Sequence, residues 1–246
     1  MLLSNIKTAR NEMFKTSRLV VIFDGMGGRL THSSVNILQA YLSKIRNVWS
    51  AFSTPLYDGY DGQSSILVHR DWLHISEATR RTMLLRRIVT TPLVFIMEAD
   101  QKIVSLQNHV QLLPSIHNIV DAMLDRRAML INAVHFTQMD VKTQDGQCYK
   151  GDHPCAWHPT LPLLSTHTFN NLPHLIRYSH YIDVVSPTVP RGYRTSPEHH
   201  ANAFALSEGN WSGWLYAGPT HSVHTKTEKI SSSAYGSVTG AAELSE

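Results

Sequence analysis

Two acidic side chains separated by one residue follow an apolar run near the middle of the chain. The run "PLVFIM" covers residues 92–97, and Glu98-Ala99-Asp100 comes directly after it. Carboxylate oxygens are the ligands that hard cations such as Mg²⁺ and Mn²⁺ prefer, and these ions bind one or two carboxylates together with phosphate oxygens. Glu98 and Asp100 therefore form a candidate cation site. The alternative is a surface turn, because Glu-Ala-Asp is a common tripeptide.

Another acid follows an apolar run near the amino terminus. "LVVIF" (residues 19–23) leads into the stretch "DGMGG", which begins with Asp24 and Gly25. Glycines at such a point let the backbone approach a ligand closely. Asp24 and Gly25 are therefore candidate ligand-binding residues, and a plain Asp-Gly turn is the alternative.

Strands and helices that alternate along the chain must position these acids. Short apolar runs, rich in β-branched residues, predict strands over 18–25, 65–69, 91–100 and 127–136. Apolar residues at helical spacing predict helices over 33–52, 76–89 and 105–126. Ser76 is the expected cap of the second helix, and Pro114 is expected to break the third.

This alternation predicts an α/β fold with a mostly parallel central sheet flanked by helices. In such sheets ligands bind beyond the carboxyl ends of strands, which is where Asp24, Glu98 and Asp100 fall. From about residue 145 onward His, Pro, Thr and Asn dominate, so the carboxyl-terminal half is expected to be rich in loops.

Two cysteines, Cys148 and Cys155, lie in that half with His153 and His158 nearby. Such ligands can bind zinc, although structural zinc loops usually have a tighter cysteine pair. A polar loop with incidental thiols is the favoured interpretation, and the zinc site stays open.

The composition indicates an ordinary globular protein. The chain has 246 residues, of which 42% are hydrophobic, enough for one domain with a full core. A formal net charge of +3 is too small to require a nucleic-acid partner. No apolar run reaches the roughly 18 to 20 residues that span a bilayer, and the amino terminus makes a poor signal peptide. We therefore expect a soluble, cytoplasmic protein without a transmembrane segment.

The stretch "RRIVTTPLVFIMEADQKIV", residues 86–104, resembles the family-2-like branch of the GT-A nucleotide-sugar glycosyltransferases. In that family a helix carrying an arginine precedes a turn and a strand that ends in Asp-x-Asp or a variant. Glu98 stands where the family usually has its first Asp. The resemblance implies a Rossmann-like GT-A domain over residues 1–230 without the usual first strand, and a flexible tail over 231–246.

The same resemblance implies a role for each candidate residue. Glu98 and Asp100, with His224 from "HSVHTK", would bind Mn²⁺ or Mg²⁺ on the diphosphate of a nucleoside-diphosphate sugar. Asp24 and Gly25 would contact the nucleoside, and Arg81, or its neighbour Arg80, would contact the phosphates. Glu198 in "SPEHH" would be the general base that takes the proton of the acceptor hydroxyl.

The predicted function is therefore a metal-dependent, hexosyltransferase-like glycosyltransferase, inverting by family resemblance. Its acceptor is an unidentified glycan, protein or lipid. One alternative is a degenerate, non-catalytic binding protein with the same fold. The other is a metal-dependent protein phosphatase, because "DGMGG" resembles the first signature of those enzymes; their later signatures, Gly-Asp-Ser-Arg and Ser-Asp-Gly, are absent from the sequence.

Overall fold

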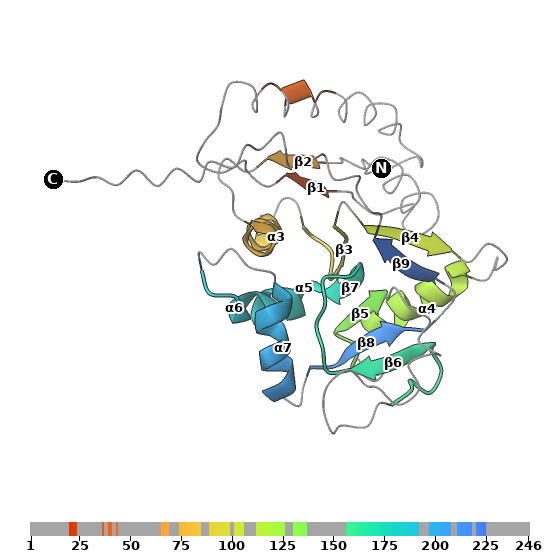
Figure 1. Cartoon of the computed structure of the whole chain (residues 1–246). Coiled ribbons are helices and arrows are strands. Elements are labelled where there is room, and N and C mark those ends of the chain that lie inside the picture. The colour runs from red at the N-terminus through yellow and green to blue at the C-terminus, as the bar shows by residue number, and fades with distance from the viewer. Residues whose placement is uncertain are drawn as a thin grey trace.

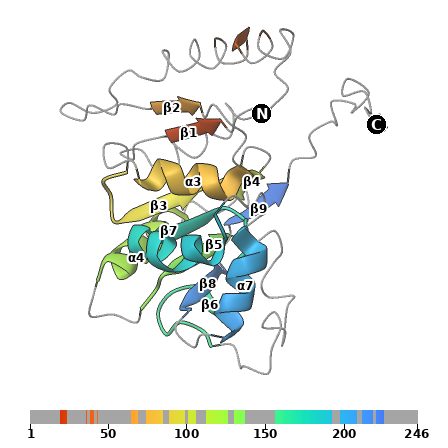
Figure 2. The same ribbon diagram turned by 90° about the vertical axis from the view of Figure 1, so that its left-hand side faces the viewer.

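Figures 1 and 2 show a computed structural model of the chain in two views at right angles. The structure describes residues 20–23, 36, 39–40, 43, 65–68, 74–84, 89–98, 101–105, 112–125, 130–136, 156–191, 197–207, 211–217 and 220–224. The predicted tail over 231–246 lies outside them.

A five-stranded sheet with the strand order β3-β7-β5-β8-β6 forms the centre of the structure. Its strands are Leu93–Ile96 (β3), His174–Arg177 (β7), Ala133–Phe136 (β5), Gly213–Tyr216 (β8) and Leu163–Thr166 (β6). β5 and β8 are parallel, whereas β7 is antiparallel to both β3 and β5, and β6 is antiparallel to β8. β3, β5 and β8 therefore run in one direction, and β7 and β6 run in the other.

The fold is thus α/β with a mixed sheet, and the prediction of a mostly parallel sheet is not confirmed. The difference comes from the half of the chain that we expected to be loops. Three strands of the sheet, β6, β7 and β8, lie between residues 163 and 216, so the loop-rich prediction was wrong there. These strands have four residues each and include Ser, Thr, His and Arg, so they lack the long apolar runs of the strands that were predicted.

Helices cover both faces of the central sheet (Figure 1). Leu112–Leu124 (α4) packs on one face, where Ile119 and Met123 contact a core that includes Val134 and Phe136 of β5. The other face carries four helical elements: His74–Leu84 (α3), Tyr178–His180 (α5), Ser186–Thr188 (α6) and Pro197–Ser207 (α7). A single π-helical turn, Tyr181–Val185 (η3), joins α5 to α6.

The alternation of side chains along each strand separates the two cores. In β7, Leu175 belongs to the core under α4, and the next residue, Ile176, belongs to the core under α3 and α7. No helix among the described residues is long and apolar enough to cross a membrane.

Two smaller sheets accompany the central one (Figure 2). Val20–Phe23 (β1) pairs in parallel with Ser65–Val68 (β2), inside the two strands predicted there. Gln101–Ser105 (β4) pairs antiparallel with Thr220–His224 (β9). Neither β4 nor β9 was predicted, and Ser105 belongs to β4 rather than to the helix that was expected to begin there.

Two of the three predicted helices are present with shifted ends, and the helix predicted over 33–52 lies almost entirely outside the described residues. α3 begins at His74, so Ser76 lies inside the helix and is not its cap. Pro114 is the third residue of α4 and does not break it. A proline is tolerated in the first turn because the first four backbone N–H groups of a helix have no partner within it.

The burial pattern of α4 gives a direct test of this packing. Met123 is 0% exposed, whereas its neighbour Leu124 is 45% exposed. We expect Met123→Ala to lower the free energy of unfolding by about 2–5 kcal/mol, because it leaves a cavity. Leu124→Ala should change it by less than about 0.5–1 kcal/mol. Chemical denaturation of both variants measures the difference, and equal losses would contradict the orientation of α4.

Candidate functional site

The acidic stretch after β3 is held in a tight connection to β4. The backbone N–H of Gln101 donates to the carbonyl oxygen of Glu98 at 3.2 Å. The backbone N–H of Glu98 donates in turn to the side-chain oxygen of Gln101 at 3.3 Å. Glu98 is half-buried, and Asp100 lies outside the described residues. The two bonds close a turn between Glu98 and Gln101, which we call the acidic reversal. It lies immediately beyond the carboxyl end of β3, where ligands were predicted to bind.

The β4–β9 pairing brings His224 to this reversal. In the register of the two strands, Gln101 lies opposite His224. Glu98 and His224, two of the three predicted metal ligands, are thus close in the backbone although they are far apart in the sequence.

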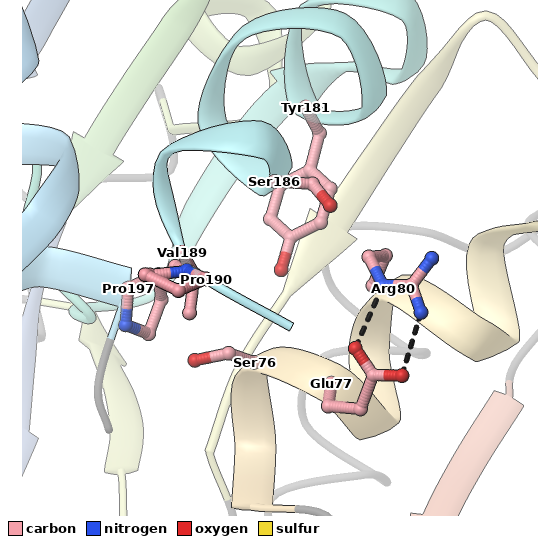
Figure 3. Close-up of a pocket in the computed structure, with 8 residues that line it drawn as sticks. All are labelled: Ser76, Glu77, Arg80, Tyr181, Ser186, Val189, Pro190 and Pro197. Carbon is pink, nitrogen blue, oxygen red and sulfur yellow. Dashed lines mark hydrogen bonds and ion pairs between the residues drawn. The ribbon is translucent and has the colours of Figure 1, made fainter. Parts of the chain in front are cut away.

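Arg81, the predicted phosphate ligand, lies on α3 in an ion pair. Its Nε donates to a carboxylate oxygen of Glu77 at 2.8 Å, and its side chain is 52% exposed. Arg80 contacts the same carboxylate more fully, because its Nε and Nη2 reach both oxygens at 2.7 and 2.6 Å (Figure 3). These bonds, those of Arg80 foremost, lower the pKa of Glu77 to about 2 against the opposing effect of partial burial.

The two arginines are consequently not equivalent. Arg80 is fixed by a fork of two charge-assisted hydrogen bonds. Arg81 makes one bond at an exposed position, where an ion pair is worth only about 0–1 kcal/mol. Of the two, Arg81 would exchange its carboxylate for a phosphate at the lower cost, and its role as a phosphate ligand stays a prediction.

Glu198, the predicted base, is the second residue of α7 and is half-buried. The preceding residue, Pro197, lines a small pocket whose empty space, open to solvent, is about 270 Å³. The other lining residues come from α3, from the helical run over 181–188 and from the segment after it: Ser76, Glu77, Arg80, Tyr181, Ser186, Val189 and Pro190 (Figure 3).

The predicted site residues therefore form two groups. The pocket places the start of α7, with Glu198, close to the helix that carries Arg81. The β4–β9 pairing places His224 close to Glu98. Figure 1 shows α7 on one side of β7 and the β4–β9 pair on the other. Asp24 and Gly25 directly follow β1 and lie outside the described residues, so the structure does not place them.

His158 of the cysteine-containing loop serves as a structural anchor. Its Nδ1 accepts hydrogen bonds from the backbone N–H groups of Thr160 and Leu161 at 3.3 and 3.2 Å. Its ring packs edge-on against Trp214 at 5.6 Å, and burial lowers its pKa. With Nδ1 accepting, a neutral imidazole carries its proton on Nε2, which leaves no lone pair there for zinc. Cys148 and Cys155 lie outside the described residues.

The part of the chain that the structure describes contains no group of three His, Cys, Asp or Glu side chains placed to hold a metal ion. Asp100 and the side chain of His224 are outside that search. The metal site therefore stays a prediction.

A cluster of buried imidazoles under α7 was missed in the sequence. His135 and His174 are paired across β5 and β7, with ring centres 5.2 Å apart. Phe169 contacts both, and Trp211 links Phe169 to His180. All three histidines are less than 10% exposed. The available signal was a histidine inside a short apolar run, as in "AVHF", which marks a buried strand position without marking a function.

Burial keeps these histidines neutral. It lowers the pKa of His174 and of His180 to about 4, with Arg177 adding to the effect at His180. Burial and, after it, the neighbouring His174 lower the pKa of His135 well below its ordinary range, and Asn170 opposes this. Neither ring nitrogen of His135 has a hydrogen-bond partner of normal geometry among the described residues.

No protein-family model matches the chain, and no curated protein matches its sequence. The case for a function therefore depends on the geometry above and on the resemblance of residues 86–104.

The buried histidines predict a loss of stability in acid. Their pKa is 6.5 in the unfolded chain and about 4 for His174 and His180 in the folded one. Between these values only the unfolded chain binds the protons, so this stability is complete above pH 6.5 and is lost as the pH falls toward 4. Each of the two should remove about 2 kcal/mol from the free energy of unfolding by pH 5.

His135→Leu tests the cluster. The variant removes a buried polar ring and should be at least as stable as the wild type at pH 7, with a smaller loss between pH 7 and pH 5. Denaturation at the two pH values measures this. His117→Gln, at an exposed position on α4, is the control and should keep the pH dependence of the wild type. If the free energy of unfolding of His135→Leu changed with pH as much as that of the wild type, His135 would not contribute to the loss of stability in acid.

Proposed function

We propose that the protein is a metal-dependent glycosyltransferase that uses a nucleoside-diphosphate sugar. The observation that carries the proposal is the pairing of β4 with β9, which brings His224 opposite the acidic reversal at the end of β3. A GT-A-like domain would need such a site beyond a strand of its α/β sheet, flanked by helices. The mixed sheet with helices on both faces is compatible with that architecture.

The donor groups at the reversal fit the proposed metal. Glu98 and Asp100 would supply carboxylate oxygens, and His224 would supply an imidazole nitrogen, a combination suited to Mn²⁺ and less so to Mg²⁺. A bound divalent ion would neutralise the charge that develops on the diphosphate leaving group. The acids would hold the donor in place, and the partial burial of Glu98 strengthens its electrostatic interactions relative to those in water.

Arg81 and Glu198 complete the proposed mechanism. Arg81 would leave Glu77 and bind a phosphate oxygen of the donor through its guanidinium fork. Glu198 would accept the proton of the acceptor hydroxyl while that oxygen attacks the anomeric carbon and the nucleoside diphosphate departs, giving inversion.

One observation favours a second candidate, a non-catalytic binding protein with this fold. α7, which carries Glu198, and the β4–β9 pair lie on different sides of β7 (Figure 1). A donor-binding protein needs the acidic reversal but does not need a base beside it. The phosphatase alternative receives less support, because those enzymes pack sheet on sheet and this sheet has helices on both faces.

Donor binding is tested by thermal shift with UDP-, GDP- and CDP-sugars, each with and without Mn²⁺. At a hundredfold excess over its dissociation constant, a ligand of the folded state stabilises it by about 2.7 kcal/mol. We expect one nucleotide class to raise the melting temperature only with Mn²⁺, and Asp100→Asn to abolish the shift. Asp121→Asn, an exposed acid on α4, is the control and should keep it. A full Mn²⁺-dependent shift in Asp100→Asn would refute the metal assignment.

Glu198→Gln separates the enzyme from the binding protein. If Glu198 is the base, the variant should bind the donor normally and lose about 10²–10⁴-fold in kcat. Asp183→Asn, an exposed acid in η3, should retain activity. Transfer rates with a panel of sugar and lipid acceptors measure the effect. Wild-type donor binding without transfer to any acceptor would favour the non-catalytic alternative.

A further inference from the structure

Gln101 is a polar side chain buried almost completely at the start of β4. It is 1% exposed, and burying an amide is costly unless both of its ends form hydrogen bonds. Both ends of this amide do. Its oxygen accepts from the Glu98 N–H at 3.3 Å, and its Nε2 donates to the backbone carbonyl oxygen of Asn171 at 2.9 Å.

These contacts join three separate parts of the proposed site. The backbone N–H of Gln101 donates to the Glu98 carbonyl, and the side-chain oxygen of Gln101 accepts from the Glu98 N–H. Together these bonds close the reversal between β3 and β4. Asn171 lies in the segment that leads into β7, the neighbour of β3 in the central sheet. The backbone of Gln101 faces His224 in the β4–β9 ladder.

We propose that Gln101 is a positioning residue for the metal ligands. Its amide fixes the backbone of Glu98 to the entry of β7, and its own backbone lies opposite His224, so that ligands from the end of β3 and from β9 would be held at one place. This inference depends on the proposed function for the presence of the metal. Hydrogen-bond partners that orient metal ligands typically affect metal affinity by 10- to 100-fold.

The test is the affinity of the pure protein for Mn²⁺ alone, measured from the electron paramagnetic resonance signal of the free ion. Gln101→Met keeps the length of the side chain and removes both hydrogen bonds. We expect it to weaken Mn²⁺ binding at least tenfold. Amide hydrogen exchange at Glu98 should also become faster, because its N–H loses its acceptor. The Glu98 readout requires neither metal nor substrate.

Thr166→Val is the matched control for a general loss of stability. Thr166 is 3% exposed on β6, and its hydroxyl bonds that of Thr168 at the far edge of the sheet. This variant should keep the wild-type Mn²⁺ affinity and Glu98 exchange rate.

The outcomes separate the two proposals. Wild-type Mn²⁺ affinity in Gln101→Met, or an equal loss in Thr166→Val, would overturn the positioning role and leave the proposed function standing. An absence of Mn²⁺ binding in the wild-type protein would overturn the metal-dependent function, and the positioning role with it.

Discussion

The structure depends on one antiparallel strand, β7, which pairs with β3 on one side and with β5 on the other. The segment before it accepts the hydrogen bond of Gln101, and the residues after it bond both α3 and the start of β3. The Tyr178 hydroxyl donates to the carbonyl of Met83, and its backbone N–H donates to that of Pro92. Because Leu175 and Ile176 enter different cores, the same strand also joins the two helical layers.

Local pattern was enough to predict the amino-terminal elements and insufficient for those that follow. The runs around Val20, Ile66 and Phe95 are β-branched or aromatic, and α4 has a clear apolar stripe, so their assignment needs no knowledge of partners. β4, β6, β7 and β9 are four or five residues long and contain His, Lys, Arg, Ser or Thr. Such segments become strands only through long-range pairing, which a local window does not contain.

The candidate site shows the same difference between residues marked by local pattern and residues placed by long-range pairing. Glu98 and Arg81 were proposed as site residues because each lies in or directly after an element that its own sequence predicts. That His224 faces Gln101 is a matter of register between strands distant in the chain, and no spacing in the sequence encodes it. Ser76 was misread as a cap, because the helix begins at His74, two residues earlier than the pattern of side chains suggests. The buried histidines gave a signal for burial but none for function, since histidines are found both on protein surfaces and in cores.

The separation of β4 from β9 along the chain has a consequence for the order in which the protein is built. The hydrogen bonds between Glu98 and Gln101 are local and are available as soon as residue 101 has been made. β9 appears only after residues 106–219, which at roughly 5–20 residues per second takes on the order of ten seconds. Pairing β4 with β9 also closes the long loop between them, and such non-local contacts form more slowly than local ones. A nascent chain therefore displays its acidic turn without His224 until β9 has been made, and only then would the proposed site be complete.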